Sequence, residues 1–140
     1  MRAVAVPVVL AMLLAGSASA APAADPVGWQ RPLVRIVAEA RRWLGDPHVA
    51  SVDVYSTTAR AFTRASNQAD PPGPDQDVYV LVLHGHLTCR LCPRPPGVPA
   101  LEGTMAAWVL ERRTLRLLEF GFGGRLDVGL LGRVQTLALP

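Results

Sequence analysis

Hydrophobic residues in the first part of the chain recur with the period of an α-helix. The apolar positions lie three or four residues apart: Leu33, Ile36, Val37, Ala40, Trp43 and Leu44. This spacing places them on one face of a helix, while charged residues fall mostly on the other side. Pro32 suits the first turn, and Gly45 followed by Asp46-Pro47 marks the end. The pattern predicts a helix with one buried face.

Two further segments carry strand patterns. Val49 to Tyr55 is rich in β-branched residues and alternates weakly. Asp77 to Leu87 alternates with apolar residues on both faces, which predicts a central strand covered on both sides. Gly85 within it indicates a bulge or a close approach of another backbone. Between these strands, the spacing of apolar residues from Ala59 to Ser66 favours a short helix over continued strand.

The second half of the chain predicts a hairpin and two irregular loops. Gly103 to Leu110 and Leu115 to Phe122 are the two expected hairpin strands. Asn67 to Gln76 and Pro93 to Pro99 are rich in proline and predict loops. The order of elements predicts an α+β fold, with an N-terminal helix packed on a curved antiparallel sheet of about four strands. The tail from Gly123 shows no pattern that assigns it.

The N-terminus has the three-part pattern of a secretory signal peptide. Arg2 precedes an apolar run from Ala3 to Ala15, which is too short to span a bilayer, and small residues follow at Ala18 and Ala20. We therefore expect a signal peptide over residues 1–20, a flexible lead over 21–30 and a single domain over 31–140. The mature protein is expected to be secreted, with no membrane attachment after cleavage.

Charge and composition narrow the choice of partners. Removing 20 of the 140 residues leaves a 120-residue chain, and the loss of Arg2 lowers the net charge from +3 to about +2. All positive side chains are arginines, and no basic stripe with interleaved aromatic residues is visible. We do not expect a nucleic-acid partner.

The densest cluster of reactive side chains runs from His84 to Cys92. It holds His84, His86, Cys89 and Cys92 within nine positions. In an exported protein an even number of cysteines favours a disulfide between Cys89 and Cys92. One alternative is a zinc or copper site that uses all four residues, although the spacing departs from the usual zinc-binding patterns. Another is a redox-active disulfide, for which no helix start is predicted at the cysteines.

Two common patterns of catalytic and cofactor sites are missing from the sequence. The chain lacks the Gly-x-Ser-x-Gly turn of serine hydrolases. The glycines from Gly121 to Gly124 do not fit the spacing of a dinucleotide-binding loop. We therefore expect a protein that is not an enzyme and needs no cofactor.

Several local strings resemble known small exported proteins. They are Ser56-Thr57-Thr58-Ala59-Arg60, the run from Val78 to Thr88, and Gly103-Thr104. Over most of Leu33 to Gly129 these strings resemble small exported proteins of unknown function from GC-rich Gram-positive bacteria, with the layout of PepSY and cystatin-like modules. PepSY modules are thought to bind or restrain other exported proteins, including peptidases. The resemblance implies a module that binds an extracytoplasmic protein or peptide. We expect the open face of the sheet and the two proline-rich loops to form its contact surface.

Overall fold

The computed structural model describes residues 30–44, 49–90 and 92–139. The expected signal peptide, residues 21–29 of the expected lead, and the helix stop at Gly45 lie outside these residues. The elements are α1 (Gln30–Leu44), β1 (Val49–Thr58), α2 (Ala59–Ala65), β2 (Asp77–Cys89), β3 (Leu101–Glu111), β4 (Leu117–Phe122), the 3₁₀ turn η1 (Val128–Leu130) and β5 (Val134–Leu137). Within these ranges, none of the helices has the length and apolar character needed to cross a bilayer.

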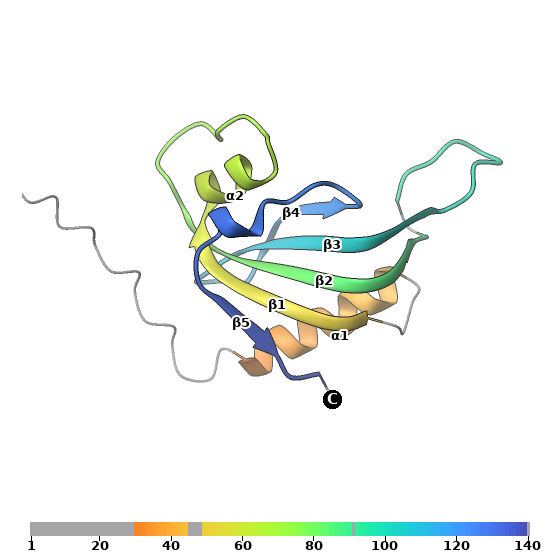
Figure 1. The fold of residues 1–140 in the computed structure, drawn as a ribbon, viewed down its shortest axis with the longest axis horizontal. Coiled ribbons are helices and arrows are strands. Elements are labelled where there is room, and N and C mark those ends of the chain that lie inside the picture. The colour runs from red at the N-terminus through yellow and green to blue at the C-terminus, as the bar shows by residue number, and fades with distance from the viewer. Residues whose placement is uncertain (1–29, 45–48, 91, 140) are drawn as a thin grey trace, which may run out of the picture.

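The strands form one antiparallel sheet in the order β4-β3-β2-β1-β5 (Figure 1). As predicted, β2 is the central strand, and its alternating residues from Val78 to Leu83 are buried on both faces. The predicted α+β class is therefore confirmed. The sheet has five strands instead of four, because the tail supplies β5 beside β1. This strand carried little pattern because only Leu137 of its four residues is buried.

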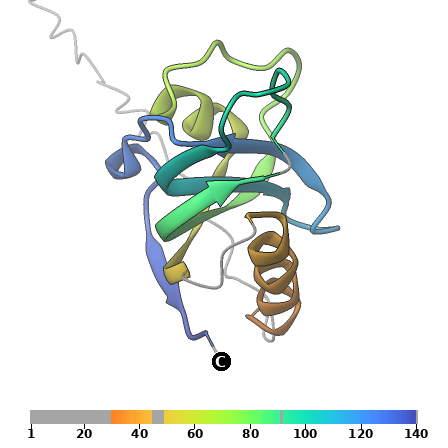
Figure 2. The same cartoon turned by 90° about the vertical axis from the view of Figure 1, so that its right-hand side faces the viewer.

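Helix α1 covers one face of the sheet, which we call the helix face (Figure 2). Leu33, Val37, Ala40 and Leu44 are buried there and belong to a core cluster that includes Trp108. The predicted buried face was too wide, because Ile36 is only half-buried and Trp43 is 45% exposed. The contacting stripe follows residues 33, 37, 40 and 44, so Ile36 and Trp43 lie to one side, next to Leu117 of β4.

The opposite face of the sheet, which we call the second face, is covered at one end by α2 and η1 (Figure 1). The expected helix at Ala59–Ser66 is confirmed as α2, and the Thr58 hydroxyl caps it by accepting from the Ala61 N–H at 3.3 Å. Phe62 and Leu131 pack there over Val80 and its neighbours in a second core cluster. The other end of this face, around His84 of β2 and Met105 of β3, is less covered.

The first proline-rich loop is tied to α2 by polar contacts. Asp75 accepts hydrogen bonds from the backbone N–H groups of Arg60 and Gln76, both at 3.0 Å, and the Arg60 guanidinium donates to the Gly73 carbonyl at 2.7 Å. Burial opposes ionisation of Asp75, but hydrogen bonds from Arg60, Thr58 and Gln76 outweigh it and lower its pKa. The stabilisation from this carboxylate is present above its ordinary pKa and is lost as the pH falls through the lowered one.

Candidate functional site

An open cleft of about 910 Å³ lies at the less covered end of the sheet. Its walls come from the start of β1, from β2 and β3, and from the segment that follows β4. The lining residues are Ala50, His84, Gly85, His86, Glu102, Gly103, Thr104, Met105, Gly123 and Gly124. Both histidines of the predicted cluster therefore line one cavity, and the cysteines do not.

A β-bulge in β2 shapes this cleft. His84 pairs with Met105, but the next pair is Leu87 with Gly103, so β2 contains one extra residue. The pairing with β1 is also irregular beside Gly85. The expectation of a bulge at Gly85 is confirmed. Because the extra residue is accommodated here, His84, Gly85 and His86 all reach the wall of the same cleft.

Two glycines on the cleft wall have structural reasons for being glycine. A Cβ on Gly103 would lie 3.3 Å from the Phe122 ring, and Gly123 has a φ of +68°, which other residues rarely adopt. At Gly124 neither reason applies, because a Cβ there has no atom within 4 Å and the backbone angle is ordinary. A side chain at Gly124, on the cleft wall, would therefore meet no steric obstacle at its Cβ.

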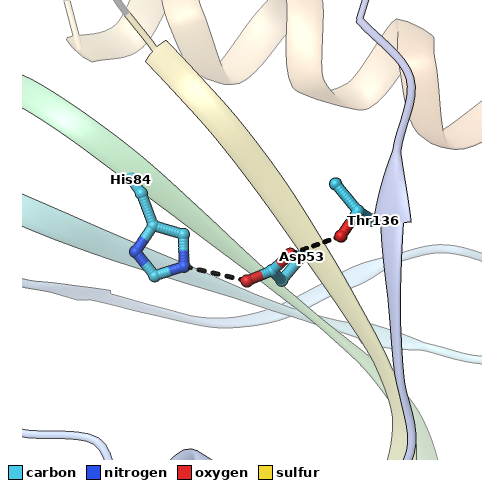
Figure 3. A network of polar contacts seen from close by, with 3 residues as sticks. All are labelled: Asp53, His84 and Thr136. Carbon is cyan, nitrogen blue, oxygen red and sulfur yellow. Dashed lines mark hydrogen bonds and ion pairs between the residues drawn. The ribbon is translucent and has the colours of Figure 1, made fainter.

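The imidazole of His84 is held by a carboxylate. Its Nε2 lies 3.2 Å from Oδ2 of Asp53 on β1, and the Thr136 hydroxyl on β5 donates to the other oxygen, Oδ1, at 3.0 Å (Figure 3). The side chains of His84 and Asp53 are 38% and 26% exposed, so the pair is partly shielded from solvent. Three neighbouring strands thus fix the orientation of one ring.

This contact determines which nitrogen of the ring is free to act. A carboxylate only accepts hydrogen bonds, so Nε2 of His84 must carry the hydrogen that it donates to Asp53. In the neutral ring, Nδ1 then keeps its lone pair, and Figure 3 shows it pointing away from Asp53. The oriented Nδ1 is therefore available as a base or as a metal ligand.

Burial and, to a smaller extent, the Asp53 charge raise the pKa of the neighbouring Tyr55, which keeps its hydroxyl protonated.

A serine lies near this ring without being coupled to it. Ser51 is opposite His84 in the β1–β2 pairing, but within the described residues the imidazole is hydrogen-bonded to Asp53 and not to the serine hydroxyl. A serine nucleophile needs its base within hydrogen-bond distance. The arrangement presents an oriented imidazole without an activated hydroxyl beside it.

The two cysteines form the expected pair at the end of β2. Cys89 and Cys92 are joined by a disulfide, with their Cα atoms 5.4 Å apart. Cys89 is 3% exposed and packs in the core cluster of the helix face, whereas His84 lies on the second face. In the described part of the chain, no group of three or more His, Cys, Asp and Glu side chains is placed to hold a metal. The four-residue site His84–His86–Cys89–Cys92 is therefore not assembled in this structure.

Removing the disulfide should cost little stability. The bridge closes a loop of only four residues, so the chain-entropy model gives a contribution of about 2 kcal/mol or less. We expect the double Cys89→Ala, Cys92→Ala variant to fold and to unfold at a modestly lower urea concentration. A variant that fails to fold would show that the bridge stabilises more of the β2–β3 end than its loop length implies.

Sequence reasoning missed the residues that lie around His84. Asp53, Thr136 and Met105 were not singled out, because each contacts the site through strand pairing that one sequence does not reveal. Alternation along β1 could have placed Asp53 on the same face as Tyr55. Nothing in the tail indicated that Thr136 would lie beside Asp53.

The chain matches no protein-family model, and comparisons with curated proteins and with solved structures find no similar chain.

Proposed function

We propose that this protein is an exported, non-catalytic module that binds another extracytoplasmic protein through the cleft beside the last part of β2 and the first part of β3. The observation that carries the proposal is the cleft itself, an open cavity of about 910 Å³ bordered by four glycines and two histidines. Cavities of this size accommodate a ligand or a short polypeptide segment.

The chemistry of the cleft wall suits a polypeptide ligand. Glycine carries no side chain, so another chain can approach its backbone closely. Glu102 and the two imidazoles add groups that accept and donate hydrogen bonds, and Met105 adds a flexible apolar surface. The second proline-rich loop, between β2 and β3, leaves the sheet at the same end (Figure 1).

Export is part of the proposal and has its own test. The N-terminal pattern and a disulfide between the two cysteines of the chain both fit a protein outside the cytoplasm. Mass spectrometry of the protein from culture medium is expected to find a chain that begins at or near Ala21. An intact chain that begins at Met1 and stays in the cytosol would contradict export.

Blocking the cleft should abolish binding of the partner without unfolding the protein. We would immobilise the chain from Ala21 to Pro140 and pass the secreted proteins of the native host over it. The Gly124→Trp variant places a large side chain at the cleft. The matched control is Gly121→Trp, since a Cβ at Gly121 would also have no atom within 4 Å, but Gly121 does not line the cleft.

We expect the native chain and Gly121→Trp to retain the same partner and Gly124→Trp to lose it. The far-ultraviolet circular dichroism and melting temperature of the three proteins establish that they are equally folded. If a folded Gly124→Trp variant retained the partner as well as the native chain does, the partner would not be bound in the cleft.

A further inference from the structure

We propose that His84, His86 and Met105 form a binding site for one cuprous ion, Cu⁺, in the cleft. The proposal needs only these side chains and does not depend on the protein partner. It differs from the four-residue metal site considered from the sequence, because a thioether replaces the two cysteines.

The fold places the three side chains on the wall of one cleft. His84 and Met105 are direct cross-strand partners in the β2–β3 pair, and such partners have Cβ atoms about 4.5–5.5 Å apart. His86 follows two residues later, beyond the bulge, and lines the same cleft. His84 and Met105 are half-buried and His86 is exposed, so the site is accessible to an ion from solution.

The donor set selects a soft metal ion. Imidazole binds several transition metals, but a thioether favours Cu⁺ over hard cations such as Mg²⁺ and Ca²⁺. A site for a harder ion would need more carboxylate, imidazole or thiolate groups, and the described residues assemble no such group of three or more. Two imidazoles and one thioether are sufficient for an ion of low coordination number.

Asp53 prepares one of the ligands. Histidines that bind metals usually donate their other ring N–H to a carboxylate, a backbone carbonyl or a water molecule, which fixes the tautomer and the orientation of the ring. His84 makes this contact through Nε2 to Asp53, and Thr136 holds the carboxylate in turn. The free nitrogen is Nδ1, so Asp53 and Thr136 act as positioning residues for a metal ligand.

The chain offers a specific spectroscopic probe for this site. Its three methionines are Met1, Met12 and Met105, and the first two lie in the expected signal peptide. A chain from Ala21 to Pro140 labelled with ¹³C at the methionine methyl groups should therefore give one methyl resonance, from Met105. We expect this resonance to move on anaerobic addition of Cu⁺ and to stop moving at one equivalent.

Competition with a chromogenic Cu⁺ chelator measures the affinity of the variants. Met105→Leu and His86→Ala each remove a ligand and should weaken Cu⁺ binding by at least about 10-fold, on the scale seen for altered metal sites. Asp53→Asn should weaken it by about 10- to 100-fold, because an amide N–H donated to Nε2 would favour a hydrogen on Nδ1. His48→Ala removes the remaining histidine, which lies outside the described residues, and should leave the affinity unchanged.

Three results would overturn the proposal. They are a Met105 methyl resonance that does not move with Cu⁺, an unchanged Cu⁺ affinity in folded Met105→Leu, and Zn²⁺ binding as tight as that of Cu⁺. The melting temperature of each variant without metal shows whether it is folded. Since the titration uses the isolated chain, its failure would leave partner binding in the cleft untouched, and loss of partner binding would not affect the copper site.

Discussion

Replacing Leu44 by alanine is expected to lower the free energy of unfolding by about 2–5 kcal/mol, the usual cost of truncating a fully buried leucine. Leu44 is completely buried at the end of α1 and packs in the core cluster of the helix face. Truncation loses its apolar contacts and leaves a cavity that the rigid sheet beneath cannot close. Urea denaturation of the chain from Ala21 to Pro140 measures the loss.

The adjacent residue provides the control for this prediction. Trp43 is larger than Leu44 but is 45% exposed, beside Leu117 at the edge of the sheet. We expect Trp43→Ala to cost only about 1 kcal/mol, because much of the ring already contacts water. A loss at Trp43 as large as that at Leu44 would mean that α1 is rotated about its axis relative to the arrangement described here.

Replacing Trp108 by alanine is expected to cost about 3–5 kcal/mol. Trp108 is in β3, is nearly completely buried, and lies with its ring centroid 4.5 Å from that of Phe120 on β4. The two rings are tilted by 59°, in the range of favourable aromatic contacts. The pair attaches the edge strand β4 to the remainder of the sheet.

A double-mutant cycle with Phe120→Ala separates this contact from general burial. We expect the two truncations to be non-additive by about 0.5–1.5 kcal/mol, since each removes the same ring-to-ring contact. Phe62→Ala, in the core cluster of the second face, combined with Phe120→Ala is the matched control and should be close to additive. Additive losses at Trp108 and Phe120 would mean that β4 does not pack on β3 in the register described.

Hydrophobic periodicity predicted most of the fold because most elements of this chain bury a regular pattern. The alternation in β2 is nearly complete, since the strand is covered on both faces, and it identified the central strand directly. The spacing in α1 gave the helix but overestimated its buried stripe. A single sequence does not reveal how far the sheet extends beneath a helix, so it could not place Ile36 and Trp43 at the margin.

The fifth strand was missed for the opposite reason. Only Leu137 of β5 is buried, so the strand exists because its backbone pairs with β1 and not because its side chains form an apolar face. Strand pairing over a long separation in sequence leaves no mark in the local pattern. The same limit applies to the candidate site. Gly85 indicated the bulge in the sequence, but Asp53, Thr136 and Met105 reach the site only through the register of the sheet.

The position of the disulfide also separates two features that the sequence placed together. His84, His86, Cys89 and Cys92 occupy nine consecutive positions, but the strand divides them between different surroundings. The bridged Cys89 completes the core of the helix face, and the histidines open onto the cleft. Proximity in sequence therefore predicted the bridge correctly and overstated the contact between imidazoles and thiols.

Site-specific photocrosslinking in the native host tests most directly whether the cleft is the binding surface. In one variant a benzophenone amino acid would replace Thr104, an exposed residue on the cleft wall. In the other it would replace Thr114, an exposed residue in the turn between β3 and β4, at the end of β3 away from the cleft. We predict that the probe at position 104 crosslinks one defined extracytoplasmic protein and that the probe at position 114 does not. Crosslinks to that protein from position 114, with none from position 104, would contradict the account.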